Sequence, residues 1–530
     1  MLSLLMLFTA AATVSGASSL LPNDRDAPGC ALDVRRNGVI VEAAATGLAN
    51  LEDGAPLTTD TVFEIGSVSK QFIGAGIALL AERGRLDVAD PIVKWLPELP
   101  PLYRGVTISM LVHHTSGIRN WNNLAELTGR GEDSTGYDNA WVLRAVARQH
   151  GVNNAPGAEY LYSNSNFVLA AIIIERASGQ PLNDFYRTAL FAHLGMTHTR
   201  WRTDFREIVQ GRAQAYGPGD RGGWQLDMPL NGVAGAGGLL STVDDLQRWN
   251  AALAAPGPDD ATWVAALLRS GALGDGTALM YGMGIETAAI ANVAAFSHAG
   301  STGSYRAWLG FFPSERVSVA LLCNSGAVNT EDLGPQVASR FLPRSTPAPN
   351  VSSVAITAPV ALAGLYRNRA NDTVVEAKID ASGLHLNGGP GFGSIDVDHL
   401  ATADGRRTAT VLRTASDEVI GLTVTRAGNS PVFLERTAAW KPSRAELSAF
   451  VGRYQSDDID GVQTVELAGD GLAWRDPAGV LHRLAPSYQD AFDAPDASWT
   501  LRFRRISKRV AALDMSITRA RRVSFHRIGP

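Results

Sequence analysis

A stretch rich in proline, serine and threonine divides this 530-residue chain into two parts of different character. It reads LPRSTPAPNVSSVAITAP, residues 342–359, a composition typical of a linker. Before it, helical and strand-like periodicities are mixed, whereas after it short alternating strands are separated by Gly and Asp turns. The length itself predicts two to four domains, because a single hydrophobic core seldom extends beyond about 300 residues.

The part after the linker carries an internal repeat. Gly364-x-Tyr366 recurs as Gly452-x-Tyr454, 88 residues later, and VTRAGNSPVFLER (424–436) resembles ITRARRVSFHR (517–527). Repetition of short alternating strands indicates two copies of one small all-β unit. We therefore predict a linker at 344–358 and two small all-β barrels or sandwiches, one at 359–440 and one at 441–530.

The part before the linker has strands at both ends and helices between them. We expect a hairpin around Asn37-Gly38 and helices ended by Gly84 and Gly179. A third helix follows a cap at Ser241 or Thr242, and two more strands flank Pro313-Ser314. This pattern predicts one mixed α/β (α+β) domain at 20–343.

The N-terminus, MLSLLMLFTAAATVSGASS, resembles a secretory signal at 1–19 with cleavage near Gly16 or Ala17. It predicts a secreted or periplasmic protein; the alternatives are a cytoplasmic protein with a buried first helix or a misplaced start codon. The rest of the chain has no 18-residue apolar span, so we expect no other membrane segment. In an exported protein Cys30 and Cys323 could be bridged, although their positions in the sequence do not show that they meet.

Composition argues against several functions. A net charge of −5 without a basic stripe disfavours nucleic-acid binding. Ten histidines and two cysteines are too few and too dispersed for a metal centre, and His113-His114 is better explained as structural. The chain has neither a dinucleotide-binding glycine pattern after a strand nor a G-x-S-x-G elbow. We expect no metal and no cofactor.

The segment FEIGSVSKQF places Ser67 three residues before Lys70. Serine before an apolar helical run usually caps the helix, and that is one interpretation. The other is a nucleophile with its base, because residues i and i+3 share one helix face. Lysine would act as that base only if burial or nearby positive charge lowered its pKa. Only five of the 47 basic residues are lysines, and only Lys70 has a serine three positions earlier.

Two further motifs follow in order: Tyr162-Ser163-Asn164, and His298-Ala299-Gly300 before a predicted strand. Together with LVHHTSGI, PGAEYLYSNSNFVLAAIIIERASGQPL, FAHLGMTHTR and GAGGLLSTVDDLQRW, they resemble the beta-lactamase and penicillin-binding-protein superfamily of serine hydrolases. The resemblance covers most of residues 29 to 330, and the forms of the motifs are similar to the class C branch. D-aminopeptidases of that branch also carry two small β-barrel domains after the catalytic one. The resemblance therefore implies a beta-lactamase-like catalytic domain followed by two small all-β barrels.

The resemblance also implies a role for each motif residue. Ser67 would be the nucleophile, and Lys70 and Tyr162 together would take its proton and return one to the leaving group; which of the two is the base stays open. Asn164 would orient Lys70 and contact the substrate amide, while His298 would take the position of the family's Lys-Thr-Gly lysine. The resemblance further implies that the strand residues Gly300 and Ser301 line the substrate site. The backbone N–H groups of Ser67 and Ser301 would form the oxyanion hole.

The His298-Ala299-Gly300 motif lacks the permanent positive charge of Lys-Thr-Gly, unless Arg306 supplies one. This favours substrates without a carboxylate at that position. We predict a serine hydrolase that acts through an acyl-enzyme on small amides or peptides and is D-aminopeptidase-like. A carboxylesterase or beta-lactamase of the same family is the alternative, and a non-hydrolytic penicillin-binding-like sensor or scaffold is an alternative of another class. The expected partner is a small molecule or short peptide, with a homodimer left open. We also expect the loop at 488–498 to reach the catalytic cleft.

Overall fold

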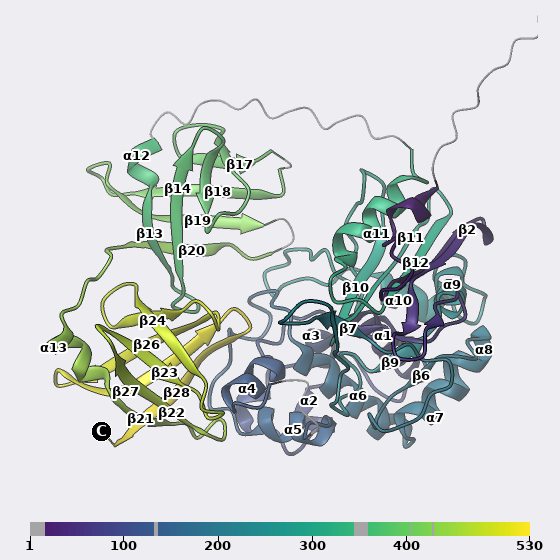
Figure 1. Ribbon diagram of the computed structural model, residues 1–530, viewed down its shortest axis with the longest axis horizontal. Helices are drawn as coiled ribbons and strands as arrows, with labels where there is room; N and C mark the ends of the chain where they lie inside the picture. The colour runs from purple at the N-terminus through teal and green to yellow at the C-terminus, as the bar shows by residue number, and fades with distance from the viewer. Residues whose placement is uncertain (1–15, 132–135, 344–358, 404, 427–428, 530) are drawn as a thin grey trace, which may run out of the picture.

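The computed structural model describes residues 16–131, 136–343, 359–403, 405–426 and 429–529 (Figure 1). The predicted linker at 344–358 and residues 1–15 of the predicted signal lie outside the described residues. The chain forms an α/β domain followed by two closed eight-stranded barrels. This confirms the predicted fold class and selects barrels over sandwiches.

The helices of the α/β domain are α1 (Ser69–Glu82), α2 (Ile92–Trp95), α3 (Ile108–Val112), α4 (Trp121–Leu127), α5 (Asn139–Ala147), α6 (Asn164–Ser178), α7 (Leu182–Tyr186), α8 (Ala192–Leu194), α9 (Val243–Ala254), α10 (Ala261–Leu268) and α11 (Thr330–Ser339). Short turns of other helix types are η1 (Ala17–Leu20), η2 (Gly66–Val68), η3 (Pro101–Tyr103) and the π-helical η4 (Arg187–Phe191). Within the described residues, no helix is both long and apolar enough to span a bilayer.

The strands of the α/β domain are β1 (Cys30–Arg36), β2 (Val39–Thr46), β3 (Leu48–Asn50), β4 (Ala55–Pro56), β5 (Phe63–Glu64), β6 (Arg200–Trp201), β7 (Tyr216–Pro218), β8 (Trp224–Leu226), β9 (Leu239–Ser241), β10 (Phe296–Thr302), β11 (Tyr305–Phe312) and β12 (Val317–Cys323). Five of them form an antiparallel sheet in the order β10-β11-β12-β1-β2. The predicted hairpins around Asn37-Gly38 and Pro313-Ser314 are β1–β2 and β11–β12.

Helices cover both faces of this sheet. Alternate residues of β1 point to opposite faces, so that Leu32 and Val34 belong to a core under α11 and η1. Ala31, on the other face, packs in the main core with α1 and α6, and α9 lies on the same side. The edge strand β10 lies against η2, which carries Ser67. The sheet thereby positions one side of the candidate site.

The first barrel comprises β13 (Gly364–Asn368), β14 (Val374–Asp380), β15 (Gly383–Leu386), β16 (Phe392–Ser394), β17 (His399–Thr402), β18 (Arg407–Arg413), β19 (Val419–Arg426) and β20 (Val432–Thr437), preceded by α12 (Pro359–Leu362). The second comprises β21 (Gly452–Gln455), β22 (Val462–Ala468), β23 (Gly471–Arg475), β24 (Leu481–Pro486), β25 (Ala491–Ala494), β26 (Trp499–Ile506), β27 (Arg509–Ile517) and β28 (Ala520–Gly529), preceded by α13 (Arg444–Leu447) and η5 (Ser448–Phe450).

The sequence repeat has a structural counterpart. In the first barrel the Tyr366 hydroxyl donates to the Leu362 carbonyl, and in the second the Tyr454 hydroxyl donates to the Phe450 carbonyl. In the first barrel, Arg436 of the last strand donates to the Ala361 and Ala363 carbonyls beside the first strand. In the second barrel, Arg527 of the last strand donates to the Ala449 and Val451 carbonyls at the corresponding place. Equivalent residues at equivalent places support the interpretation of the two barrels as duplicates.

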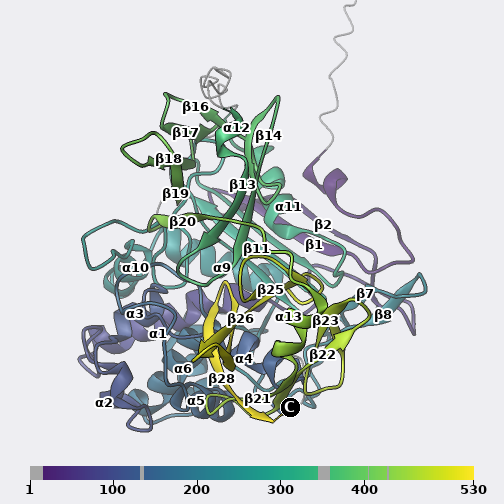
Figure 2. The same cartoon turned by 90° about the vertical axis from the view of Figure 1, so that its left-hand side faces the viewer.

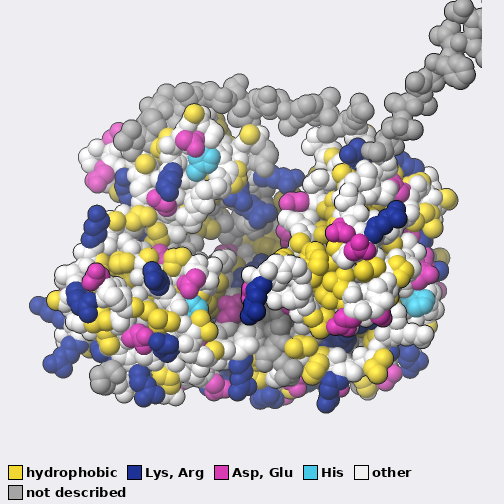
Figure 3. All heavy atoms as spheres, in the orientation of Figure 1, with side chains coloured by type: hydrophobic (Ala, Val, Ile, Leu, Met, Phe, Trp, Pro, Cys, Tyr) yellow, Lys and Arg dark blue, Asp and Glu magenta, His cyan; other side chains and the backbone are white. Residues whose placement is uncertain are grey.

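The second barrel packs directly on the helical part of the α/β domain (Figures 1 and 2). Leu124 and Leu127 of α4 belong to the same hydrophobic cluster as the barrel interior, and Gln463 Nε2 donates to the Leu127 carbonyl at 2.8 Å. The first barrel is joined to the second at Asp372, whose side chain accepts from Arg502 and Arg522. A hollow lies between the α/β domain and the barrels, with basic and acidic side chains around it (Figure 3).

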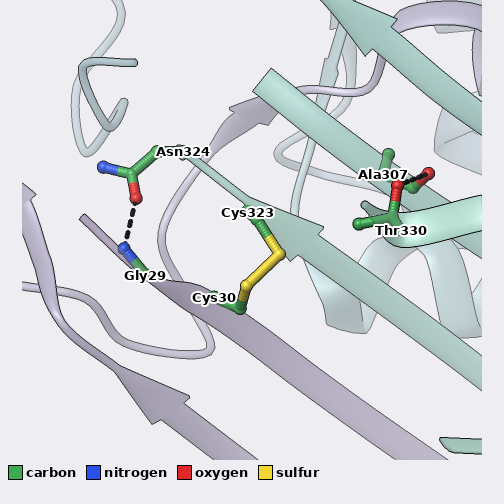
Figure 4. The surroundings of a disulfide bond; sticks show 6 residues. All are labelled: Gly29, Cys30, Ala307, Cys323, Asn324 and Thr330. Carbon is green, nitrogen blue, oxygen red and sulfur yellow. Dashed lines mark hydrogen bonds between the residues drawn. A yellow bond between two sulfur atoms is a disulfide. The ribbon is translucent and has the colours of Figure 1, made fainter. Parts of the chain in front are cut away.

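Cys30 and Cys323 form a disulfide between neighbouring strands (Figure 4). They are directly paired residues of β1 and β12, with Cα atoms 4.0 Å apart, although 293 residues separate them in sequence. A bridge that closes so long a loop constrains the unfolded chain strongly. It ties the start of the α/β domain to its last central strand.

Replacing both cysteines by alanine should lower the free energy of unfolding of the α/β domain by about 2–5 kcal/mol, because the unfolded chain regains the freedom that the bridge removes. Denaturant unfolding followed by tryptophan fluorescence measures this. A thiol reductant should destabilise the wild type by a similar amount and leave the double variant unchanged. Equal midpoints for oxidised and reduced wild type would contradict the prediction.

Candidate active site

Ser67 lies in η2, at the point where β5 turns into α1. Gly66, just before it, has a positive φ of 51°, which favours glycine. α1 begins at Ser69, and its N-cap residue, Val68, makes no side-chain cap. Ser67 is therefore not the capping residue of this helix, and its hydroxyl is directed to other groups.

Two side chains converge on the Ser67 hydroxyl. Lys70 Nζ lies 2.9 Å from Ser67 Oγ, and the Tyr162 hydroxyl donates to the same oxygen at 2.9 Å. Lys70 also donates to the Ala236 carbonyl at 2.7 Å. The i,i+3 spacing from η2 into the first turn of α1, and the start of α6 after Tyr162, thus bring together three of the residues proposed from the sequence.

The surroundings favour neutral forms of both partners of Ser67. Lys70 is completely buried, and burial, followed by the positive charge of Arg519, holds its pKa well below the ordinary value of a lysine. Burial raises the pKa of Tyr162, against a smaller lowering by its hydrogen bond to Ser67 and by Arg519. The site therefore contains an amine that can accept a proton and a phenol that keeps its own.

His298 lies beside this arrangement, with its ring centre 6.3 Å from that of Tyr162, and its catalytic role stays a prediction. It is buried, with Nδ1 2.6 Å from the Ala299 carbonyl and Nε2 3.0 Å from the Tyr281 hydroxyl. Burial and the nearby Lys70 lower the pKa of His298 to about 3, so the ring is neutral. Nδ1 must then carry the hydrogen, and both ring nitrogens are engaged within the protein. We interpret His298 as a residue that positions β10.

Asn164 does not make the expected contact with Lys70. Its Nδ2 donates to Asn122 Oδ1 at 2.8 Å, and the Ala236 carbonyl orients Lys70 instead. Asn164 Oδ1 is buried without a hydrogen-bond partner. It lines a pocket of about 90 Å³ beside Ser67, whose other lining residues are Glu64, Trp121, Asn122, Asn231, Val233, Ala236, Gly237, Gly238, Ser301 and Thr302.

β10 presents a backbone donor to the same pocket. Ser297 exchanges two hydrogen bonds with Glu286, so its N–H and C=O point away from β11. Because this orientation repeats every second residue, the N–H of Ser301 also points outward. A Cβ on Gly300 would lie 3.1 Å from Ser67 N, which shows how closely the strand approaches the nucleophile. The N–H groups of Ser67 and Ser301 therefore stay the predicted donors of the oxyanion hole.

The expectation that the loop at 488–498 reaches the cleft is wrong. Tyr488 is buried and its hydroxyl donates to the Asp372 carbonyl, at the junction of the two barrels. The turn between β27 and β28 reaches the site instead, and places the Arg519 guanidinium carbon 4.8 Å from the centre of the Tyr162 ring. The repeated Thr-Arg pair of the sequence echo marks this turn, whereas the Ala236 carbonyl has no side-chain signal.

Within the described ranges, no three His, Cys, Asp or Glu side chains are grouped as a metal site would require. The geometry is that of a serine hydrolase, and residues 14–338 match the family described as Beta-lactamase. The chain belongs to the Beta-lactamase family. It is a serine hydrolase of that family, and D-aminopeptidases are among the proteins that resemble it along nearly the whole chain.

Proteins named for different activities are similar to this chain. A D-aminopeptidase of Cereibacter sphaeroides (strain ATCC 17029 / ATH 2.4.9) is 26% identical over 97% of this chain and 98% of its own. Esterase EstB of Burkholderia gladioli is 35% identical over 33% of this chain and 47% of its own. The octameric penicillin-binding protein homologue from Pyrococcus abyssi shares the fold, with 21% identity and a TM-score of 0.55 over 78% of this chain and 96% of its own.

Replacing Gly66 by alanine should lower kcat by about a hundredfold or more. The new Cβ would lie 2.5 Å from Ser301 N, forcing the strand and its oxyanion-hole donor away from Ser67. Gly54→Ala is the matched control, because Gly54 also has a positive φ, 73°, but no atom within 4 Å of the added Cβ. Steady-state kinetics should show near-normal kcat for Gly54→Ala. Near-normal kcat for Gly66→Ala would contradict the assignment of the Ser301 N–H as an oxyanion-hole donor.

Proposed function

We propose that this enzyme hydrolyses short peptides and small amides through an acyl-enzyme at Ser67, as a D-aminopeptidase-like hydrolase. The observation that carries the proposal is the position of Ser67 Oγ, within 2.9 Å of both a buried lysine amine and a tyrosine hydroxyl. The similarity to a D-aminopeptidase along 97% of the chain, both barrels included, supports the peptidase assignment.

Acylation begins with neutral Lys70. Its lone pair accepts the Ser67 hydroxyl proton while Oγ attacks the scissile carbonyl carbon, and the carbonyl π electrons move to the oxygen. The N–H groups of Ser67 and Ser301 stabilise that oxyanion. Because its pKa is lowered, Lys70 can serve as the base, and Tyr162, whose pKa is raised, keeps its proton until the leaving nitrogen takes it.

Collapse of the tetrahedral intermediate breaks the C–N bond. The leaving nitrogen takes the Tyr162 hydroxyl proton, and the proton held by protonated Lys70 then restores the phenol. Water next attacks the acyl-enzyme, gives a proton to Lys70, and Ser67 Oγ leaves with that proton. Ser67, Lys70 and Tyr162 return to their starting states.

The pocket beside Ser67 suits a small acyl group. At about 90 Å³ it accommodates a short side chain, and the free Asn164 Oδ1 is an acceptor for an amino or amide N–H of the substrate. Glu64 on its wall is already ion-paired with Arg202 and Arg212, at 2.8 and 3.2 Å. Because Asn164 Oδ1 can accept an N–H of the substrate, we expect substrates whose acyl part is a small amino acid with a free amine.

Esterase activity is the second candidate. The pocket and the oxyanion hole place no demand on the leaving atom, and the 35% identity to an esterase over a third of the chain favours it. An ester needs less help from Tyr162, because an alkoxide or phenoxide leaves more readily than an amide nitrogen. Relative turnover of amides and esters therefore separates the two functions.

Intact-protein mass spectrometry tests the nucleophile. A fluorophosphonate should add one label to the wild type and none to folded Ser67→Ala. Turnover of D-alanine p-nitroanilide above its L-isomer would support the D-aminopeptidase assignment. Turnover of p-nitrophenyl acetate alone would support the esterase, and of nitrocefin alone a beta-lactamase. An unlabelled, folded wild type would contradict the catalytic assignment and favour a binding protein.

We also propose that the protein is exported. The Cys30–Cys323 disulfide supports this, because such bonds persist in oxidising compartments. The backbone N–H groups of Ala17 and Ser18 donate to the Glu42 carboxylate at 2.9 and 2.6 Å, and Ala17 is buried. Removal of a segment ending at residue 19 would delete these contacts, whereas cleavage after Gly16 would keep them.

Expression in a host with an export pathway should yield a mature chain that begins at Ala17 or Ser18. Cleavage after Gly16 would leave an ammonium group facing Glu42, where opposite charge favours it. Mass spectrometry of the exported protein identifies the first residue. A chain that keeps Met1 and stays in the cytoplasm would contradict the proposal.

A further inference from the structure

The turn between β27 and β28 is held firmly on the α/β domain. The backbone carbonyl of Arg519 accepts hydrogen bonds from Asn120 N at 2.9 Å and from Asn153 Nδ2 at 3.0 Å. Two residues later, Arg521 forms an ion pair with Glu159 at 2.7 Å. These contacts fix the backbone of the turn beside the candidate site.

The side chain of Arg519, by contrast, is uncommitted. Its guanidinium lies over the Tyr162 ring, it is exposed, and it has no ion pair among the residues that the structure describes. A guanidinium carries five N–H donors in one plane, and contact of its face with a ring leaves the donors at its edge free. Arg519 therefore offers the cleft a cation that can bind a carboxylate in a two-pronged manner.

The other basic residues near the cleft that could bind a carboxylate are engaged within the protein. Arg306, expected as a replacement for the missing strand lysine, donates from both terminal nitrogens to the carbonyls of Gly303, Tyr305 and Gly326. His298 is neutral, and Lys70 is buried against Ser67. Arg519 is left as the cation next to Tyr162.

Other charged groups influence the same region. Glu286 and Glu331 raise the pKa of Tyr162 slightly, after the larger effect of burial. At Tyr160, Glu286 raises the pKa of the hydroxyl, and Arg426 from the first barrel lowers it. Neither Glu286 nor Glu331 forms an ion pair with Arg519 in the part of the chain that the structure describes, so its guanidinium stays available to a ligand.

Arg519 lies on the side of the scissile bond where the leaving group departs. In the proposed reaction Tyr162 gives its proton to the leaving nitrogen, so the leaving group must pass beside Tyr162. The small pocket that receives the acyl group is lined by Ser67 and Asn164 but not by Tyr162. A substituent on the leaving nitrogen is thus directed towards the guanidinium.

We propose that Arg519 binds a carboxylate on the leaving group, which makes the enzyme selective for substrates such as dipeptides with a free C-terminal carboxylate. This inference rests on the proposed reaction at Ser67. It assigns to a residue of the second barrel the anion-binding role that the His298-Ala299-Gly300 strand lacks. Arg519 is then a specificity residue supplied by a domain outside the catalytic fold.

The test compares substrates that differ only in the charge of the leaving group. D-Ala-Gly and D-Ala-Gly amide form the peptide pair, and 3-acetoxybenzoate and 3-acetoxybenzamide form the ester pair. Wild type should prefer the carboxylate member by about tenfold to a hundredfold in kcat/KM, as expected for a charge-assisted hydrogen bond. Arg519→Gln should abolish the preference, mainly by raising KM, and Arg519→Lys should retain part of it.

Arg509→Gln is the matched control, because Arg509 is an exposed arginine at the other end of β27, with no ion pair in the described structure. This variant should keep the wild-type preference. Loss of the preference in Arg509→Gln as well would show a general effect of protein charge and overturn the proposal, as would an unchanged preference in Arg519→Gln.

The pH profile gives an independent readout. The positive charge of Arg519 disfavours protonated Lys70, so its removal should raise the pKa of Lys70. The acid limb of kcat/KM for 3-acetoxybenzamide should therefore move to higher pH in Arg519→Gln and stay in place in Arg509→Gln. His114 and His298, which also face Lys70, are unchanged in both variants. An unmoved acid limb would overturn the proposed proximity.

Failure of the proposed function has a different signature. If the wild type hydrolyses neither peptide but is labelled at Ser67 and hydrolyses the esters, the peptidase assignment fails, and the ester pair still decides the role of Arg519. A carboxylate preference in the esters that depends on Arg519 supports the inference. Equal turnover of both esters overturns it.

Discussion

The buried guanidinium of Arg119 ties the second barrel to the loop that shapes the active site. It donates to Asp458 Oδ2 at 2.7 Å and to the backbone carbonyls of Arg521 and Arg522. The next residue, Asn120, donates its N–H to the Arg519 carbonyl and accepts the N–H of Asn164. The loop before α4, the start of α6 and the turn of the barrel are therefore one hydrogen-bonded unit. Any shift of the barrel would be transmitted to the residues around Ser67.

This interaction specifies a position more than it adds stability. Burying two charges has a large desolvation cost, which is offset only when the remaining donors and acceptors are satisfied. Asp458 also accepts from the backbone and ring nitrogens of His150, and Arg119 donates to the Gln149 side chain as well, so each partner makes several hydrogen bonds. A buried network whose members hydrogen-bond one another favours the docking geometry in which all of them are satisfied. A catalytic domain that takes a specificity residue from another domain needs such a constraint, because a displacement of about 1 Å would weaken binding of the substrate.

The parts of the site that depend on local sequence could be predicted, and those that depend on docking could not. Ser67 and Lys70 share a helix turn, so their contact follows from an i,i+3 spacing. The Ala236 carbonyl that orients Lys70 belongs to a distant loop, and a carbonyl has no side-chain signature. The polar segment around Tyr488 resembled a lid because of its polar length, but Tyr488 donates to the Asp372 carbonyl at the barrel junction and Asp490 accepts from Arg505 within the second barrel. Alternation and turn residues predicted the barrels, since these patterns reflect each barrel's own core.

The sequence echo between the barrels places the turn that reaches the site in the context of its counterpart in the first barrel. The echo between VTR and ITR aligns Arg426 of the first barrel with Arg519 of the second, and each lies at the last hairpin of its barrel. Both hairpins face the α/β domain: Ser430 Oγ donates to the Ala158 carbonyl, and the Arg519 carbonyl accepts from Asn120. The interior contacts that the two copies share maintain each barrel without reference to the cleft. The turns are free of that requirement, so the two aligned arginines have different surroundings: Arg426 acts electrostatically on Glu286, and Arg519 lies over Tyr162.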